Sequence, residues 1–378
     1  VVVCNHPAFG GSHLPDVTVL TPVFASPEDA EPLAILANRA HHAEIGGTRP
    51  GSMPPSATRL VEEGVAIPPT RLFAGGVAGW SAVERLLREA PHPSRAVEEN
   101  LADLAAQVAA NRRGEDRLSA LLEEIGTDAF VAGLADLAAH GVRTFRTALP
   151  DLLPKPRRAR IELDDGTPIE VALSRTVDDA GPRLRVDFTG TAGVHPGNLN
   201  APRAIVQAAT LYVLRVLLGP GIPLHEGLFE AIDLVVPPGL LDPPCPDDPA
   251  EAPAVAAGNT ETSQRIVEAL MLAFGRIAAG QGTMNNVLLG NDRFGTYETL
   301  GGGAGATAEA CGASAVHTHM TNTRLADPEF VERRHPLRIV ECSIRRGSGG
   351  AGLLRGGDGL RRVYEALEPI TACVVSEH

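Results

Sequence analysis

Residues 5–24 have the sequence NHPAFGGSHLPDVTVLTPVF, and residues 33–39 continue with LAILANR after a turn-rich segment. The apolar and β-branched residues of 17–24 and 33–39 predict two strands joined as an antiparallel hairpin. If Phe24 lies opposite Leu33, this register places Asp16 opposite His41. We therefore expect a β-hairpin near the start of the chain, with a glycine-rich loop before its first strand.

The hairpin register predicts a metal site formed by His13, Asp16 and His41. Imidazole and carboxylate are ligands that borderline divalent ions prefer. Opposed Cα atoms lie about 4.5–5.5 Å apart, and His13 can fold back over Asp16 on its glycine-rich loop. His42 would point to the opposite face, although a slip of one residue exchanges it with His41. The alternative is a set of histidines satisfied by ordinary hydrogen bonds.

A second pair of histidines, His317 and His319, is separated by one residue. On a strand both rings would point to the same face. Such a pair, followed by Asn322 and Arg324, could bind an anionic or amide substrate or contribute to a metal site. The alternative is a polar strand end that caps a loop.

The composition excludes several classes of function. The 378 residues carry a formal net charge of −13, which argues against sequence-independent binding to nucleic acid or anionic membranes. The single lysine, Lys155, is followed by Pro156, so the chain has no phosphate-binding loop of the G-x-x-x-x-G-K-[ST] type. Five scattered cysteines indicate reduced thiols and a cytoplasmic protein. Apolar, strand-like sequence at both ends predicts that the chain is a piece of a longer protein.

The distribution of these patterns predicts an α+β fold, a mixed multi-sheet, β-rich core with an inserted helical hairpin. Residues 1–90 would hold the hairpin, a Gly/Pro-rich region and the metal site. Residues 91–156 would form a helical hairpin whose helices, 96–113 and 116–140, are separated at Gly114. Residues 157–378 would form a mixed core of strands and helices with glycine-rich loops.

Three stretches combine Asn, Thr and Gln at or near predicted helix ends. They can form a pocket of uncharged hydrogen-bonding groups suited to an amide or imide ring. The alternative for any single residue is capping and turn chemistry. The stretches are residues 197–203, 258–265 and 281–286.

The order of these motifs resembles the hydantoinase B / 5-oxoprolinase family over nearly the whole chain. The N-terminal signature is Asn-x-Pro-x-x-Gly-Gly-x-His-x-Pro-Asp-Val-Thr at residues 5–18. Further matching segments are ANRAHHAEIGG at 37–47, PGSMP at 50–54, DFTGT at 187–191, GNLNAP at 197–202, GNTETSQ at 258–264, QGTMNN at 281–286, YETLGGG at 297–303 and HTHMTNTR at 317–324.

The resemblance implies an ATP-dependent enzyme acting on cyclic amides such as hydantoins or 5-oxoproline. ATP would be bound by an A-type subunit or domain, so we expect a hetero-oligomer. The related carboxylases hold a divalent metal through a His-x-x-Asp pair and a later histidine, which correspond to His13, Asp16 and His41. The spacing between Asp16 and the later histidine leaves His42 as an alternative ligand. The metal could be Zn, Mn or Fe.

The implied reaction begins with phosphorylation of the amide oxygen by the A-type part. A metal-bound water of lowered pKa would then attack the ring carbon, with His42 or Glu44 as general base. His317 and His319 are further catalytic candidates. The alternatives are a subunit of an ATP-dependent ketone carboxylase and a non-catalytic scaffold for the A-type partner.

Overall fold

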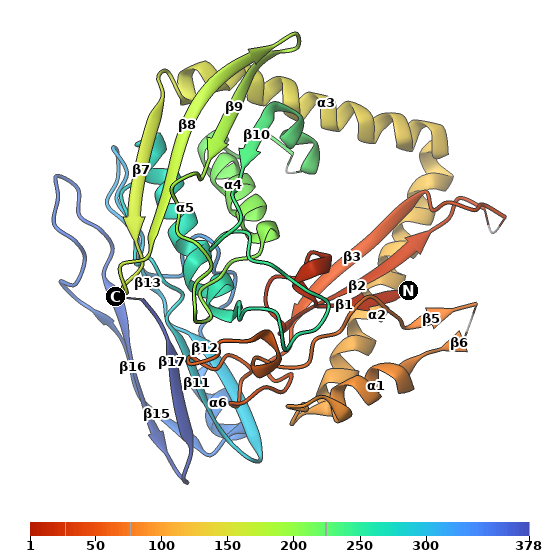
Figure 1. The fold of residues 1–378 in the computed structure, drawn as a ribbon, viewed down its shortest axis with the longest axis vertical. Coiled ribbons are helices and arrows are strands. Elements are labelled where there is room, and N and C mark those ends of the chain that lie inside the picture. Colours follow the sequence, from red (N-terminus) through yellow and green to blue (C-terminus); the bar gives the residue numbers. More distant parts are fainter. Residues whose placement is uncertain (27, 76, 224, 378) are drawn as a thin grey trace.

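The computed structural model describes residues 1–26, 28–75, 77–223 and 225–377. It has the predicted α+β architecture, with three main sheets and helices packed between and around them (Figure 1). The first sheet has the strand order β3-β2-β1-β4 and is antiparallel. Its strands are β1 (Val2–Cys4), β2 (Asp16–Val23), β3 (Ala34–His41) and β4 (Thr70–Arg71).

The predicted hairpin and its register are confirmed. Strands β2 and β3 pair from Val23 opposite Ala34 to Asp16 opposite His41. Buried residues alternate along β2, so that one face of the sheet packs into the core while the other carries Asp16. The two predicted ligands therefore emerge side by side from the same end of the hairpin.

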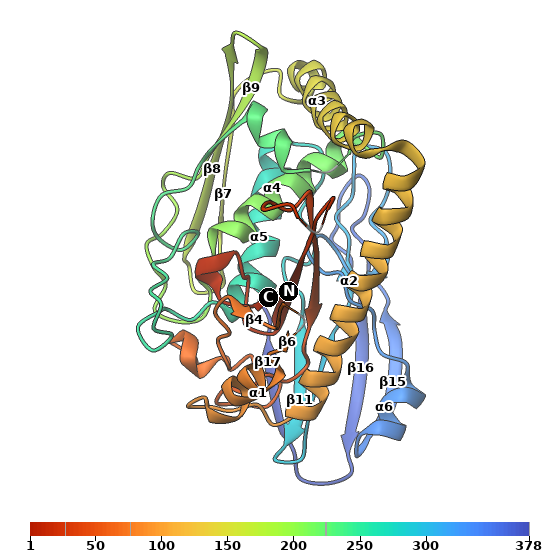
Figure 2. The ribbon, with the colours of Figure 1, turned by 90° about the vertical axis from the view of Figure 1, so that its right-hand side faces the viewer.

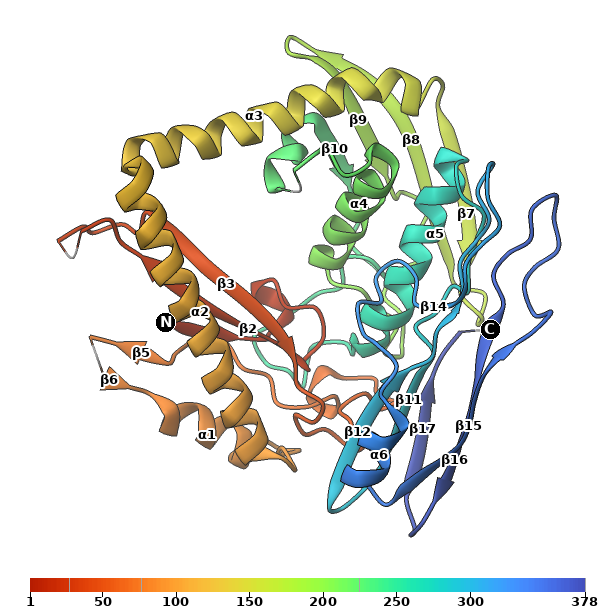
Figure 3. The same ribbon diagram turned by 180° about the vertical axis from the view of Figure 1, so that it is seen from behind.

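Helix α2 (Val97–Ile125) covers the face of the hairpin that is opposite to Asp16 and His41 (Figure 3). Besides apolar side chains, it buries the amides of Asn100, Gln107 and Asn111 against the sheet. Gln107 Nε2 donates to the Val17 carbonyl at 2.9 Å, and Asn111 Nδ2 donates to the Val19 carbonyl at 3.1 Å. Helix α1 (Trp80–Glu89) completes this core beneath α2.

The two successive helices predicted for this segment are present, but their predicted boundary at Gly114 is wrong. Helix α2 continues through Gly114 to Ile125, and the chain turns at Gly126, whose φ of +82° favours glycine. A Cβ atom at Gly114 would lie 3.2 Å from Leu36 Cδ1, so this glycine allows α2 to approach β3 closely. Helix α3 (Thr127–Leu152) then leaves the C-terminal end of α2 at a steep angle, as Figures 2 and 3 show.

The second sheet is an antiparallel meander of three strands to which a fourth strand is added in parallel. Its order is β10-β9-β8-β7, with β10 parallel to β9. The second half of α3 and two further helices pack on it to form the largest core. The elements are β7 (Arg157–Glu162), β8 (Pro168–Asp178), β9 (Gly181–Asp187), β10 (Ile232–Val235), α4 (Arg203–Leu218) and α5 (Ser263–Phe274).

The last third of the chain forms a third sheet, in the order β12-β11-β17, and small paired strands. Its elements are β11 (Asn286–Asn291), β12 (Phe294–Thr299), β13 (Gly302–Gly303), β14 (Ser314–Val316), α6 (Pro328–Arg334), β15 (Leu337–Arg345), β16 (Gly359–Ala366) and β17 (Thr371–Val375). The short pair β5 (Phe73–Ala74) and β6 (Val77–Ala78) belongs to the first third.

The helical segment 91–156 contributes to two cores. Residues of α2 pack with the first sheet, whereas residues of the second half of α3 pack with the second sheet. The predicted divisions at 90 and 156 stay predictions. Within the described ranges, no helix is long and apolar enough to cross a membrane.

Candidate metal centre

The loop before β2 folds His13 over Asp16. A Cβ atom at Gly11 would lie 2.1 Å from the Asn5 carbonyl oxygen, so the tight path of this loop requires glycine. The Asn5 side chain donates to the Leu14 carbonyl at 2.7 Å, and the Asp16 amide donates to the His13 carbonyl at 3.1 Å. These bonds place the imidazole of His13 beside the end of the hairpin.

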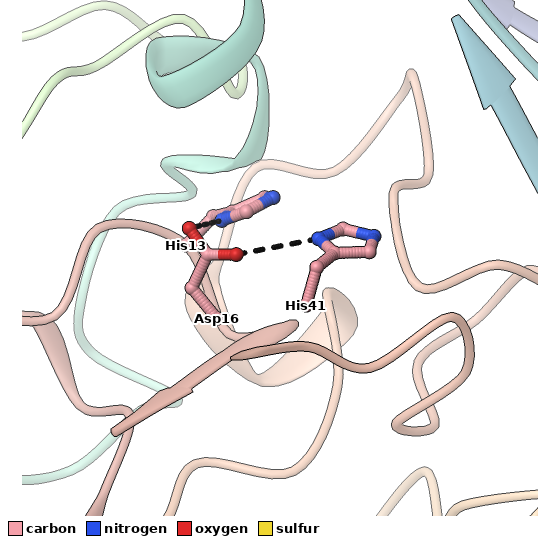
Figure 4. A group of neighbouring side chains, drawn as sticks. All are labelled: His13, Asp16 and His41. Carbon is pink, nitrogen blue, oxygen red and sulfur yellow. Dashed lines mark hydrogen bonds and ion pairs between the residues drawn. The ribbon is translucent and has the colours of Figure 1, made fainter. Parts of the chain in front are cut away.

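The three predicted ligands meet at this point (Figure 4). His13 Nδ1 lies 3.2 Å from Asp16 Oδ2, and His41 Nδ1 lies 3.3 Å from Asp16 Oδ1. One candidate ligand atom from each residue lies within 4.8 Å of the others. The hydroxyl of Ser12 donates to Asp16 Oδ2 at 2.7 Å and orients the carboxylate.

The electrostatics of the trio suit a cation. Burial would raise the pKa of Asp16, but the neighbouring rings of His13 and His41 hold it well below its usual range. Asp16 is therefore a carboxylate. Among the described residues His41 Nε2 is buried without a hydrogen-bond partner, and His13 Nδ1 contacts Asp16 outside hydrogen-bonding geometry. Two imidazoles and one carboxylate are a ligand set that would fit Zn, Mn or Fe.

The trio lines a pocket of about 290 Å³. The remaining walls come from distant parts of the chain, including the π-helical turn Gly258–Thr262, strand β12 and the segment after β14. Most of the polar groups among these walls are uncharged. The other lining residues include Arg39, Asn259, Met284, Tyr297, Thr321, Asn322 and Thr323.

Two wall residues contact the predicted ligands directly: Asn259, which belongs to the stretch 258–265 predicted to line a polar pocket, and Tyr297, to which the sequence analysis gave no role. Asn259 Nδ2 lies 3.4 Å from His13 Nε2. The ring of Tyr297 lies 4.9 Å from that of His41, and its hydroxyl donates to Asn286 Oδ1 at 2.7 Å. Burial raises the pKa of Tyr297, so the phenol is a neutral donor. Tyr297 begins the matching segment YETLGGG, but nothing local predicted its place beside His41, because it reaches the hairpin only through the tertiary fold.

His42 points away from the trio, as strand alternation predicts. Asn100 Nδ2 lies 3.1 Å from His42 Nδ1, and Gln107 Oε1 lies 3.3 Å from His42 Nε2. Burial also lowers the pKa of His42, which favours the neutral ring. Both ring nitrogens of His42 pair with α2, which favours a structural role for this histidine, and its role as general base or alternative ligand stays a prediction.

Glu44 also has a structural environment. Its carboxylate accepts from the Gly46 and Gly51 amides at 2.6 and 2.9 Å and pairs with Arg95 at 3.1 Å. It lines a neighbouring pocket and is not among the residues lining that of the trio. These contacts shape the loop after β3 and favour a structural role for Glu44, and its role as a general base stays a prediction.

His317 and His319 do not share a strand face. Strand β14 ends at Val316, and His319 has a left-handed backbone with φ of +53°. His317 Nε2 lies 3.0 Å from Thr299 Oγ1, whereas His319 Nδ1 lies 3.4 Å from the Tyr212 hydroxyl on α4. Burial lowers the pKa of His319 to about 4. The structure brings neither histidine into the lining of the trio's pocket, although the residues that follow them do line it.

Only some residues of the three predicted Asn/Thr/Gln stretches line the pocket. Asn259 lines it, but Asn198 and Asn200 donate to backbone carbonyls elsewhere, and Gln264 donates to the Thr318 carbonyl and the Thr321 hydroxyl. Gly258 lies against Asn200, where a Cβ atom would be 1.9 Å from the carbonyl oxygen. The amides of Asn198, Asn200 and Gln264 therefore position the wall segments and do not themselves line the pocket.

Comparison with known proteins assigns the fold to a family. The profile of the family described as hydantoinase B/oxoprolinase matches residues 1–378. The chain is 39% identical to 5-oxoprolinase 1 of Arabidopsis thaliana, over the whole chain but only 31% of that protein. The chain thus spans less than a third of the length of this relative.

Two solved structures have similar folds. An ATP-dependent caprolactamase from Pseudomonas jessenii aligns with a TM-score of 0.81 at 25% identity, covering 98% of this chain and 65% of that one. A nucleotide-free acetone carboxylase aligns with a TM-score of 0.82 at 18% identity, covering 100% of this chain and 53% of that one, which shows the fold alone. With the match to the family profile along its entire length, the chain belongs to the hydantoinase B/oxoprolinase family.

Proposed function

We propose that this chain is the B-type part of an ATP-dependent hydrolase of cyclic amides, and that it opens the ring in the pocket above His13, Asp16 and His41. The observation that carries the proposal is the convergence of these three side chains at a pocket whose other polar lining groups are mostly uncharged. Family membership and the similarity to 5-oxoprolinase and caprolactamase support it.

The proposal assigns ATP to an A-type subunit or domain. The chain carries no G-x-x-x-x-G-K-[ST] sequence, since its single lysine is followed by proline. The plant relative is more than three times as long as the matched region, which leaves room for a nucleotide-binding part. Phosphorylation of the amide oxygen by that part would turn a poor electrophile into one with a good leaving group.

The residues of this chain would bind and orient the ring. The trio would hold a divalent ion, which when bound supplies Lewis-acid chemistry at an oxygen. The side-chain amides of Asn259 and Asn322 and the hydroxyl of Thr321 line the same pocket and can donate to a ring carbonyl or accept from a ring N–H. Directional contacts of this kind restrain the ring and raise the effective concentration of the reacting groups.

Metal analysis of the purified full-length protein or complex tests the ion. We expect close to one divalent ion per chain after reconstitution, and its loss in His13→Ala and Asp16→Asn. The chain offers a matched control, because His195 Nε2 lies 2.8 Å from Asp165 Oδ2 outside the trio's pocket. The variants His195→Ala and Asp165→Asn should retain the ion. Metal content near zero after reconstitution would refute the metal site.

Activity is tested by ATP-dependent opening of 5-oxoproline and hydantoin rings with the A-type part present. The proposal expects ring opening that requires this chain and is lost on chelation. Turnover of a ketone that depends on bicarbonate would instead identify a carboxylase. Ring opening that proceeds equally well with the Asp16→Asn variant would contradict a role of the trio in the reaction.

A further inference from the structure

Arg39 lies on the same face of the hairpin as the predicted ligands. It stands opposite Thr18 in the register and two residues before His41 on β3. Side chains two residues apart on a strand point to the same side and are separated by about 6.5–7 Å along it. Arg39 accordingly lines the pocket of the trio.

The guanidinium of Arg39 is held in place without being neutralised. Its Nε donates to Thr18 Oγ1 at 2.8 Å, and Nη2 donates to the Gly10 carbonyl at 2.9 Å. Both acceptors are uncharged, and no ion pair links Arg39 to a carboxylate within the ranges that the structure describes. Nη1 and one hydrogen of Nη2 remain to bind a ligand.

The charges around the pocket favour an anion beside Arg39. Asp16 is the only acidic residue that lines it among those described, and it is already shared by two imidazoles. The other polar lining groups are hydroxyls and amides. A divalent ion at the trio would leave the pocket with a net positive charge. A neutral ring would not offset this charge, whereas an anionic ring would.

We propose that Arg39 binds a carboxylate carried by the ring substrate, so that this chain acts on a lactam acid in preference to a neutral lactam. The inference rests on the proposed function, whose substrate class it names. In this arrangement the ring carbonyl lies at the trio. A carboxylate on the ring carbon at the other side of the ring nitrogen then points along β3 toward Arg39. A guanidinium fork matches both carboxylate oxygens, and charge-assisted bonds of this kind are about twice as strong as neutral ones.

A phosphoryl group transferred to the amide oxygen is a second anion that the same guanidinium could meet. It would be present with every ring that is activated, whether or not the ring carries an acid. The two sources are therefore separated by comparing rings that differ only in the carboxylate.

The test uses the full-length protein or complex with ATP and two probes, 5-oxoproline and 2-pyrrolidinone, which share one ring. We expect Arg39→Gln to raise KM and the dissociation constant for 5-oxoproline roughly 10- to 100-fold, as loss of a charged hydrogen bond does. The same constants for 2-pyrrolidinone should change less than about 3-fold. Arg39→Lys should lie between, because it keeps the charge but not the fork.

The matched control is Arg71→Gln, since Arg71 is an exposed arginine of the same sheet that does not line the pocket. It should leave both probes unchanged, and metal content should be unchanged in every variant. Equal losses for both probes in Arg39→Gln, or a wild-type protein that binds both equally, would overturn the proposal. A binding preference that depends on Arg39 without ring opening of either probe would support it while contradicting the proposed reaction.

Discussion

The adjacent histidines His41 and His42 should respond in opposite ways to the same substitution. His42→Ala removes the contacts with Asn100 and Gln107 and leaves both buried amide groups without these partners. Each unsatisfied group costs about 1–3 kcal/mol, and the space vacated by the ring adds to this, for a total of about 3–5 kcal/mol. His42→Ala should thus destabilise the fold, while all three predicted metal ligands remain in place.

His41→Ala should do the reverse. Its ring is 26% exposed, and its only hydrogen-bonding contact in the described structure is with Asp16 at 3.3 Å. The free energy of unfolding should fall by about 1 kcal/mol or less. Loss of one of three ligands should lower metal affinity by more than the roughly 10- to 100-fold that removal of an outer-shell partner costs.

The assay is thermal melting in chelator together with metal titration of the same variants. Unfolding entropy is about 2.1 cal/mol/K per residue, so for 378 residues 1 kcal/mol shifts Tm by about 1.3 °C. His42→Ala should lower Tm by about 4–6 °C and His41→Ala by about 1 °C. Chelator is required because bound metal itself raises Tm.

The exposed His140 on α3 provides the control, since His140→Ala should change neither quantity. Loss of metal in His42→Ala with retention in His41→Ala would refute the assignment of ligands from the hairpin register. A His42→Ala variant that melts within about 1 °C of the wild type would refute the stabilising role of the contacts with α2.

The remaining predictions concern pH and the turn between the helices. Because burial lowers the pKa of His319 from 6.5 to about 4, the unfolded chain takes up a proton first as the pH falls. The contribution of the neutral, buried ring to folding stability is complete above about pH 6.5 and is lost as the pH falls toward 4. His319→Asn should therefore flatten the decline of Tm over that range. An unchanged dependence of Tm on pH would contradict this. Gly126→Ala should cost about 1–3 kcal/mol in denaturant unfolding, since φ is +82° and ψ is 153° there. Gly114→Ala should change stability by about 1 kcal/mol or less, because its Cβ meets only the flexible end of Leu36; the reverse order of the two effects would refute the observed helix boundary.

The meeting of His13, Asp16 and His41 was predictable because it depends on local rules. Strand alternation and a short connection determine the pairing of Asp16 with His41, and His13 lies only three residues away. The helix boundary was not predictable, because Gly114 weakens a helix in isolation and is tolerated here through its contact with Leu36. The apolar spacing of α2 does not record that contact.

The contacts between the pocket walls and the predicted ligands were beyond local reasoning. Tyr297 and Asn259 reach the ligands only through strand pairing and helix packing that span most of the chain. The histidine pair of residues 317–319 lies next to the wall segment, but the left-handed backbone at His319 separates the two rings. A spacing of two residues indicates a shared face only where the strand continues.

The arrangement of the ligands within residues 13–41 has a consequence for the order of folding. Closing a hairpin of this length is fast, whereas bringing Asn259 to His13 requires contacts between residues 246 positions apart. The trio of His13, Asp16 and His41 can therefore form early, and the pocket walls around it only once the C-terminal third is in place. Slow formation of the pocket around a preformed trio would appear as metal uptake that precedes the recovery of ring binding during refolding.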